Sequence, residues 1–420
     1  MAFFSKLLTR MRPEGTEGAA PHSADLRDTF ALRLLSVLST LGVPANYDAD
    51  AFALRLSSGS VSWLGNRFEE WLRTDPKHHE ALLLQIAASI FEASQPSPLA
   101  QAGDARAHLR PRVRQRAHHV IVGLQLQADG VDGWQLSQTF LPLTDDLGVE
   151  VVYDTPTNIV SVPVERLEGW GLDPSQALEV AIDNLRRADA VPFRCDGDGV
   201  WLASCGDCYD SARLLLVDEI AALPLAGEPV ALPANRDNLA ITGSENLGGL
   251  YRLLQLAVSA LDLPRLDTLQ PVVLRDGVWV DWLPQTDHPM REAFYELAVR
   301  SRGNSYAELK DLLDAAADSG PVASYGMLRP HDDSLPWSHA VWPTSSGLLP
   351  ESDLVSVLHP GGARYVVVPR RWLLEVVGHL MEPVPDLHPP YHTVRGAPDL
   401  SQWEVLAARK VFEGEVGGTP

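Results

Sequence analysis

The stretch of residues 199–242 constrains the fold of this chain more than any other. It reads GVWLASCGDCYDSARLLLVDEIAALPLAGEPVALPANRDNLAIT, in which strand-like runs and an apolar, helix-like run alternate with polar turns. Such alternation predicts a chain that packs helices against sheets. Asp, Arg, Ser and Asn are concentrated in the turns at 206–213 and 235–237, so both turns are candidate functional sites.

Length and composition limit the class of protein. At 420 residues, with 45% hydrophobic and 21% charged residues, the chain is typical of a globular protein of two or three domains. Its net charge of −21 disfavours nucleic acid and anionic membranes as partners. Three cysteines are too few for a disulfide framework and indicate a reducing compartment. We find neither a secretory signal nor a run of roughly 20 apolar residues, and therefore expect a cytoplasmic protein.

Segments rich in Gly, Pro and Ala divide the chain into units. We expect an α+β (mixed α/β) fold with a central mixed sheet covered by helices. Similar short segments at 210–212 and 338–340 suggest that the C-terminal unit echoes the central one. The expected units are a flexible N-terminal segment at 1–25, a small helical or α+β unit at 26–93, a central domain at 105–262, a C-terminal α+β domain at 263–405 and a flexible tail at 406–420.

Hydrophobic periodicity and turn residues predict individual elements. Amphipathic or Leu-rich runs predict helices at 26–41, 78–91 and 247–261. We expect Asn184 to lie at the edge of a helix and to bond to the neighbouring sheet. Further expected elements are a strand at 121–126, a helix capped by Asp173 and Gln176, a hairpin that turns at Asp276 and Gly277, separate helices at 290–300 and 306–317, and an irregular segment from Glu382.

The only basic run is a strip of alternating arginines. In an extended strand Arg110, Arg112, Arg114 and Arg116 fall on one face, which suits an anion or nucleic acid. No aromatic residue is interleaved with them for base stacking, and the rest of the chain is acidic. The strip is therefore an anion-binding candidate, and a solvated or internally paired face is the alternative.

The two polar turns admit a structural and a functional interpretation. Asp210 is placed to cap the helix expected after it. Oxygen atoms of Asp207, Asn235 and Asp237 could meet at one sheet edge and hold Mg²⁺ or Ca²⁺. Arginines in the same turns could instead neutralise these carboxylates in ion pairs. The ligand-binding candidates are Asp207, Asp210, Ser211, Arg213, Asn235, Arg236 and Asp237.

Cysteine spacing gives a weak metal candidate. Cys205 and Cys208 have C-x-x-C spacing, with Cys195 ten residues upstream of the first. A single C-x-x-C pair lacks the fourth ligand that a zinc site needs. The sequence contains no G-x-S-x-G, Walker A, H-E-x-x-H or dinucleotide-binding glycine motif. We therefore expect no cofactor, and incidental or buried thiols are the default interpretation.

Four motifs follow one another along the first two thirds of the chain. They are LGNRF at 64–68, RPRVRQR at 110–116, GDCYDSARLLL at 206–216 and PANRDNL at 233–239. Together, over about residues 26–260, they resemble the YtpQ-like family of bacterial proteins. The resemblance implies a cytoplasmic α/β or α+β bacterial protein and emphasises the two polar turns. It brings no activity, cofactor or catalytic residue with it.

These observations favour a non-catalytic module that binds another protein or a small ligand, since the sequence shows no pattern typical of an activated nucleophile or of four metal ligands. The alternative is a divalent-metal-dependent hydrolase or transferase that uses Asp207, Asn235 and Asp237. A nucleic-acid binder built on the arginine strip is a less favoured hypothesis. The tryptophans that could line a partner surface, or simply pack, are Trp279, Trp282, Trp337 and Trp342.

Overall fold

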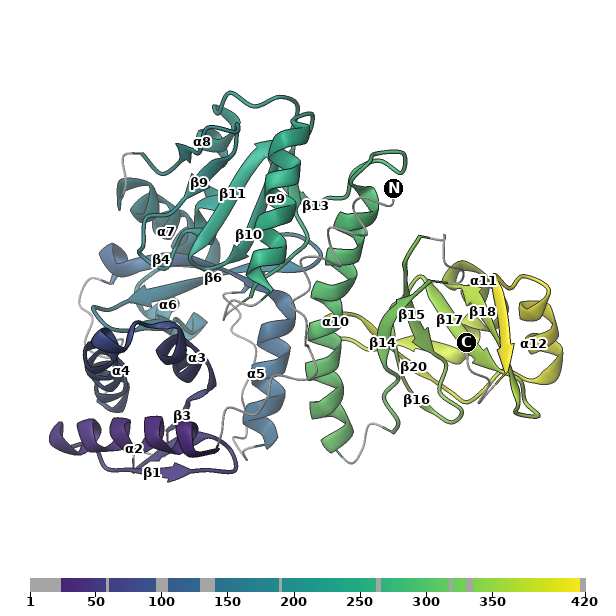
Figure 1. The fold of residues 1–420 in the computed structure, drawn as a ribbon, viewed down its shortest axis with the longest axis horizontal. Helices are drawn as coiled ribbons and strands as arrows, with labels where there is room; N and C mark the ends of the chain where they lie inside the picture. Colours follow the sequence, from purple (N-terminus) through teal and green to yellow (C-terminus); the bar gives the residue numbers. More distant parts are fainter. Residues whose placement is uncertain are drawn as a thin grey trace.

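The computed structural model describes residues 24–57, 60–95, 105–128, 140–188, 191–261, 266–316, 320–329 and 335–415. It is an α+β protein, as expected, with three lobes (Figure 1). The N-terminal lobe lies beside the central domain, and the long helix α10 stands between the central and C-terminal domains (Figure 1).

The N-terminal lobe packs three helices around a small antiparallel sheet. Phe30, Leu34, Phe68 and Trp71 form its core, and the helices predicted at 26–41 and 78–91 are confirmed. Its elements are α2 (Ala24–Thr40), β1 (Ala45–Asp48), β2 (Ala53–Leu56), β3 (Val61–Trp63), α3 (Gly65–Arg73), the 3-10 helix η1 (Pro76–His78) and α4 (His79–Ser94).

The central domain is organised by a six-stranded sheet of order β13-β12-β10-β11-β9-β8, in which every pairing is antiparallel rather than mixed. The expected domain boundary after residue 262 is wrong, because Val273 of β12 pairs with Val230 of β10. The hairpin predicted at Asp276 and Gly277 is confirmed; φ values of 50° and 78° there suit a tight turn. The strands are β8 (Arg194–Cys195), β9 (Trp201–Ala203), β10 (Pro229–Asn235), β11 (Asn238–Gly243), β12 (Val272–Arg275) and β13 (Val278–Asp281).

A second sheet, of four strands, belongs to the same domain. Val113 and Val152 from this sheet share one core cluster with Ala231 and Ile241 of the larger sheet. Leucines of α9 pack on the other face of the larger sheet. The remaining elements are η3 (Arg106–His108), β4 (Leu109–Gln115), β5 (Leu141–Pro142), β6 (Leu147–Asp154), β7 (Ile159–Ser161), α6 (Val164–Gly169), α7 (Pro174–Ala188), η4 (Ser211–Leu215), α8 (Val217–Ala221) and α9 (Leu247–Ala260).

Helix α7 begins as the sequence predicts. Gln176 N–H donates to Asp173 Oδ1 at 2.9 Å, and Asp173 N–H donates to Gln176 Oε1 at 3.1 Å, which completes a capping box. Asn184 Nδ2 donates to the carbonyl of Leu109 on β4 at 3.1 Å. The predicted bond from this helix to the neighbouring sheet is therefore confirmed.

The strand predicted at 121–126 is wrong, because these residues lie within α5 (Arg116–Ala128). A short apolar run of this kind does not distinguish a buried helix from a strand. Ala117, Val120 and Ile121 instead pack against Tyr306 and neighbouring residues of α10. Tertiary packing thus decides the conformation.

Helix α10 (Arg291–Ala315) is continuous for 25 residues, so the prediction of two helices split at Gly303 is also wrong. Its first half buries Phe294 and Leu297 against α9 and the six-stranded sheet. Its second half buries Tyr306 and Leu309 in a different cluster, between α5 and the C-terminal domain. Packing on both sides of Gly303 outweighs the roughly 1 kcal/mol that a helical glycine costs.

The C-terminal domain contains a five-stranded and a three-stranded sheet. The expected irregular segment from Glu382 is corrected, and so is the flexible tail over 406–415, because strands and a helix continue to Glu415. Residues 416–420, and the flexible segment expected at 1–25 as far as residue 23, lie outside the described residues. The two short segments that suggested an echo of the central domain differ in conformation, since 338–340 lies in a strand whereas 211–212 lies in η4. The elements are β14 (Tyr325–Leu328), β15 (Trp337–Val341), β16 (Gly347–Pro350), β17 (Leu354–Leu358), β18 (Arg364–Pro369), α11 (Arg370–Val377), η5 (Gly378–Leu380), β19 (Met381–Pro383), β20 (Tyr391–Val394), α12 (Leu400–Ala407) and β21 (Phe412–Glu415).

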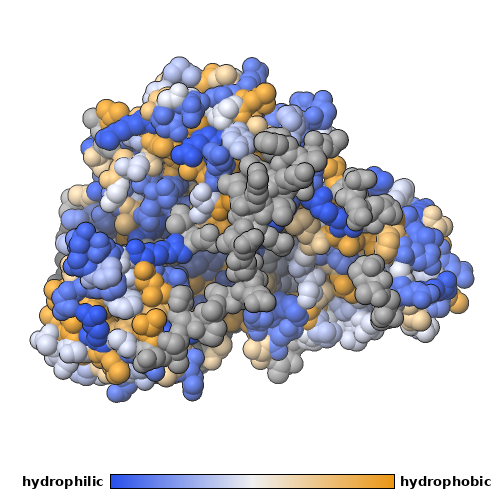
Figure 2. Space-filling model, in the orientation of Figure 1, coloured by the Kyte–Doolittle hydropathy of each residue, from blue (hydrophilic) through white to orange (hydrophobic). Residues whose placement is uncertain are grey.

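The coloured surface in Figure 2 shows small groups of hydrophobic residues among hydrophilic ones. Single exposed apolar side chains are normal for a folded protein and mark no site by themselves. Within the described ranges, no helix combines the length and the apolar character needed to cross a membrane.

Candidate functional site

The first polar turn is organised by a buried arginine. The Arg213 side chain is 1% exposed; its Nη2 donates to Asp207 Oδ2 at 2.8 Å and its Nη1 to Asp207 Oδ1 at 3.0 Å. The same Nη1 lies 3.2 Å from Asp210 Oδ1, which also accepts the Cys205 N–H at 2.8 Å. The prediction that Asp210 caps a helix is wrong, because its carboxylate is occupied by Cys205 and Arg213 instead.

The environment gives the two carboxyl groups opposite pKa shifts. Burial raises the pKa of Asp210, although the Cys205 N–H and Arg213 oppose this effect. Burial also disfavours the charged form of Asp207, but the paired bonds from Arg213 outweigh it and hold its pKa below the usual value. The Asp207 oxygens therefore serve an ion pair within the chain.

Arg236 and Asp237 form the tight turn between β10 and β11. Asn235 Oδ1 accepts the Asp237 N–H at 3.0 Å, and the Arg236 Nε lies 3.3 Å from Asp237 Oδ2. Ser211 N–H donates to the Arg236 carbonyl at 3.2 Å, so the two polar turns are neighbours in space. Within each turn the side chains form ion pairs and turn contacts. This is the arrangement given above as the alternative to a divalent-ion site.

The metal candidates do not converge either. Cys195 lies on the edge strand β8, whereas Cys205 directly precedes the first polar turn and Cys208 lies in it. Among the residues that the structure describes, no three His, Cys, Asp or Glu side chains are grouped so that they could hold a metal ion.

Arg110, Arg112 and Arg114 lie on the extended strand β4, as expected, whereas Arg116 is wrongly placed by that prediction because it begins α5. Most of the arginine strip is engaged within the chain. Arg110 and Arg116 donate to backbone carbonyls. Arg112 pairs at 2.6 Å with Glu150, whose side chain is fully buried. Burial lowers the pKa of Arg114, whose Nε has no partner in the described part of the chain. A polyanion would find little free charge on this strip.

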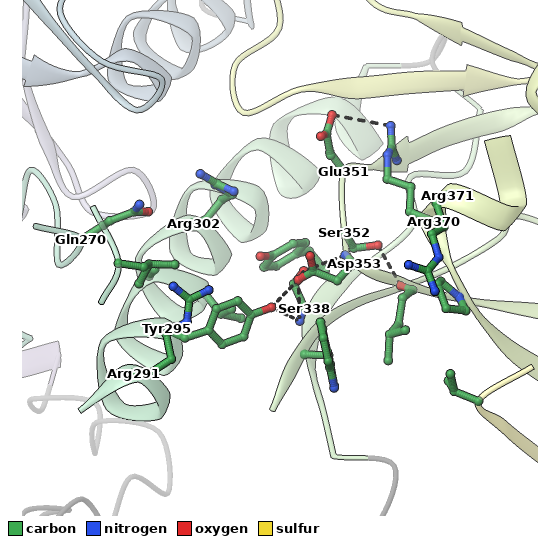
Figure 3. A pocket seen from close by; sticks show the side chains of 18 residues that line it. Gln270, Arg291, Tyr295, Arg302, Ser338, Glu351, Ser352, Asp353, Arg370 and Arg371 are labelled. Atoms are coloured by element: carbon green, nitrogen blue, oxygen red, sulfur yellow. Dashed lines mark hydrogen bonds and ion pairs between the residues drawn. The ribbon is translucent and has the colours of Figure 1, made fainter. Parts of the chain in front are cut away.

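A cavity of about 690 Å³, which we call the junction pocket, lies between α10 and the C-terminal domain (Figure 3). Arg291, Tyr295, Ala298 and Arg302 line one wall. Their i, i+4, i+7, i+11 spacing places them on one face of α10. The polar residues on the C-terminal side are Ser338, Glu351, Ser352, Asp353, Arg370 and Arg371.

Two of the pocket arginines are anchored but retain unused donors. Arg302 Nη2 donates to Asp146 Oδ2 at 3.0 Å, and Arg370 Nη2 lies 3.5 Å from Glu351 Oε2. Arg302 Nε and Arg370 Nη1 are buried and have no hydrogen-bond partner among the described residues. These two atoms have almost no exposed surface, so other atoms of the two guanidinium groups must meet a ligand in the pocket. The Arg302 side chain is 33% exposed and the Arg370 side chain 15% exposed.

Asp146 anchors Arg302 from the central domain. Its carboxylate also lies 3.5 Å from His388 Nε2 of the C-terminal domain. Burial opposes ionisation of Asp146, but His388 and Arg302 outweigh it and hold its pKa below the usual value. Burial would likewise lower the pKa of Arg302, yet the Asp146 charge raises it. The three side chains join the central domain, α10 and the C-terminal domain at the edge of the pocket.

Tyr295, Ser338 and Asp353 form a hydrogen-bonded cluster across the pocket (Figure 3). The Tyr295 and Ser338 hydroxyls both donate to Asp353 Oδ2, and the Asp353 N–H donates to Ser338 Oγ at 2.8 Å. Burial and the Asp353 carboxylate raise the pKa of Tyr295. The phenol is therefore a neutral donor near pH 7 and holds α10 to the C-terminal domain.

Aromatic surface completes the pocket. Tyr325 stacks on Tyr306 with a centroid separation of 4.5 Å, and burial raises its pKa to about 12. Trp337 is 41% exposed and lines the cavity. The other tryptophans singled out in the sequence, Trp279, Trp282 and Trp342, are buried and therefore pack, as the alternative interpretation held.

This arrangement suits binding better than covalent chemistry. An activated serine needs a neighbouring base such as histidine, whereas the Ser338 hydroxyl donates to a carboxylate that already accepts another hydroxyl. No His, Cys or Lys occurs among the described residues that line the pocket. Fixed donors, aromatic surface and a concave shape are the usual features of a small-molecule site.

The junction pocket is not predictable from local sequence patterns, because its residues come from segments far apart in the chain. The detectable signal was the spacing of Arg291, Tyr295 and Arg302 on one helical face, which the expected break at Gly303 concealed. Arg370 and Arg371 directly follow a strand that stops at Pro369. A pair of arginines at that position gives no indication of which helix lies opposite.

Comparisons with protein-family models, curated proteins and solved structures found no match to this chain. The resemblance to the YtpQ-like family and the function expected from the sequence therefore stay predictions.

Proposed function

We propose that this chain is a non-catalytic binding protein that takes a small ligand into the junction pocket. The observation that carries the proposal is the pocket wall itself: Arg302 and Arg370 are held in place by Asp146 and Glu351, and their side chains, 33% and 15% exposed, line the cavity. A site whose donors are fixed in advance loses little conformational entropy when a ligand binds.

The divalent-metal alternative finds less support. Both oxygens of Asp207 accept from Arg213, and Asn235 Oδ1 accepts from Asp237 and Asn238. A metal would have to displace a buried cation before it could bind there.

A ligand-observed NMR screen of the full chain, with a library of anionic, neutral and cationic fragments, tests the proposal. Ala298 is 9% exposed and lines the pocket, so Ala298→Trp should fill it and abolish binding. Ala315→Trp, on an exposed position of the same helix, is the matched control and should bind as the native chain does. Ala298→Leu tests the same point with less bulk if the larger side chain disturbs folding, which unfolding curves reveal. Binding that survives in both Ala298 variants would disprove the site.

We also propose a YtpQ-like, bacterial and cytoplasmic protein. The support comes from the collinear motifs between residues 26 and 260 and from the small number of cysteines. Fractionation of cells that express the full chain checks the location, and recovery with membranes or outside the cell would contradict it.

A further inference from the structure

We infer that the ligand of the junction pocket is a small organic oxyanion, bearing a phosphate or carboxylate group that Arg302 and Arg370 recognise. The inference rests on the proposed function and adds the chemical class of the ligand.

Positive charge is concentrated in the pocket of a strongly acidic protein. The chain as a whole carries a net charge of −21. Of the described residues that line the pocket, four are arginines and two are carboxylates, Glu351 and Asp353. A concave site with this local excess of cations attracts anions against the field of the whole molecule.

The four arginines are not equivalent. Arg291 Nη1 donates to the Pro284 carbonyl at 2.7 Å, and the Arg371 guanidinium lies over the Trp372 ring at 5.1 Å from its centroid. Arg302 and Arg370 are the two that carboxylates, Asp146 and Glu351, hold in position at the pocket wall. They line the pocket from α10 and from the start of α11, and the Arg370 side chain extends toward Glu351 (Figure 3).

The hydroxyl groups nearby do not offer the same recognition. The protons of Tyr295 and Ser338 are both directed to Asp353, so these groups are not free to donate to a ligand. An oxyanion must then be bound by the arginines, whose planar, charged N–H groups match phosphate and carboxylate oxygens. Tyr325 and Trp337 provide aromatic surface for the organic part of the ligand.

Four related probes separate recognition of the anionic group from contact with the aromatic surface. They are phenyl phosphate, benzoate, phenol and benzylamine, titrated into the full chain at constant ionic strength. We expect phenyl phosphate or benzoate to bind at least roughly tenfold more tightly than phenol or benzylamine, because a hydrogen bond to a charged group is lost with the neutral probe. The tighter of the two anions distinguishes a phosphate from a carboxylate ligand.

Lysine variants identify the residues that bind the oxyanion. Arg302→Lys and Arg370→Lys keep the charges that face Asp146 and Glu351 but remove the guanidinium fork, and each should weaken binding roughly tenfold. Arg395→Lys, which changes an exposed arginine paired with Glu382, is the control and should have no effect. Unfolding curves of all three variants show whether each one folds.

The outcomes separate the inference from the proposed function. Anion binding that is unchanged in both lysine variants would overturn the inference. If the pocket retains only neutral or cationic fragments, and Ala298→Trp abolishes their binding, the proposed function stands and the oxyanion inference is wrong. If none of the four probes and no library fragment binds, both are wrong.

Discussion

Arg213 donates hydrogen bonds to both carboxylate oxygens of Asp207, at 2.8 and 3.0 Å, and its own side chain is only 1% exposed. The bond pair closes the turn between β9 and η4, and Asp210 lies against the same guanidinium. The first polar turn, at residues 206–213, is therefore held together by an internal ion-pair network.

Arg213→Met should destabilise the protein by about 3 kcal/mol, because it leaves the buried Asp210 carboxylate without its cation. Urea unfolding of the full chain measures the change. The control is Arg186→Met, which breaks a surface pair with Glu219 and should cost no more than about 1 kcal/mol. Equal losses in the two variants would show that the buried network contributes nothing beyond surface charge.

Asp267 should make stability depend on pH in an unusual direction. Burial raises its pKa to about 7, despite the opposing charges of Arg114 and Arg112. Between about pH 4 and pH 7 the folded chain keeps a proton that the unfolded chain has released, so stability from this group falls as pH rises. Asp267→Asn removes that dependence, and its stability relative to the native chain should improve by at least about 1 kcal/mol from about pH 5 to about pH 8.

Urea unfolding curves across that pH range test the Asp267 prediction. Asp198→Asn, which removes a carboxylate at an exposed position, is the control for the substitution itself, and its effect on stability should be small. If the difference between Asp267→Asn and the native chain stays constant with pH, Asp267 ionises normally in the folded protein.

The contribution of Asp146 to stability should depend on pH in the opposite direction to that of Asp267. Its pKa is depressed in the folded chain, so its contribution is present at neutral pH and is lost as pH falls through the folded pKa. Asp146→Asn should cost about 2 kcal/mol near pH 7, since it removes the partner of Arg302 and His388. Thermal melting at neutral and acidic pH checks this, and the gap between variant and native chain should close below about pH 4. A gap that widens in acid would contradict the ion pairs.

The tryptophans offer a matched comparison of packing and exposure. Trp279 is 2% exposed and its ring N–H donates to the Leu214 carbonyl at 2.9 Å. Trp279→Ala should therefore cost about 3–5 kcal/mol, whereas Trp337→Ala, at a 41% exposed position, should cost about 1 kcal/mol or less. Chemical denaturation of both variants measures the difference. Similar losses would place Trp337 in a packing role and weaken its assignment to the pocket.

Local signals in the sequence were sufficient for elements whose conformation is decided nearby. The capping pair Asp173 and Gln176, and the hairpin turn at Asp276 and Gly277, depend on residues a few positions apart, and both predictions are confirmed. Residues 121–126 and Gly303 were misassigned because their conformation depends on partners that are distant in sequence. Periodicity does not contain that information.

The candidate site was less predictable than the fold. The polar turns concentrate charged residues in a few positions, so they are visible in the sequence, yet their charges are satisfied internally. The junction pocket draws Arg302 and Arg370 from separate domains, and its chemistry exists only when α10 meets the C-terminal domain. An ion pair and a binding site use the same residue types, and only the arrangement in space separates them.

Helix α10 also imposes a rotational constraint. Its two halves belong to different cores, with Phe294 on one side of Gly303 and Tyr306 on the other. Each residue advances a helix by about 100°, so one inserted residue near Gly303 would turn the second core-facing stripe away from its partners while the first stayed in place. The number of residues between the two halves of the helix is therefore constrained. It determines how the C-terminal domain is oriented toward Arg291, Tyr295 and Arg302.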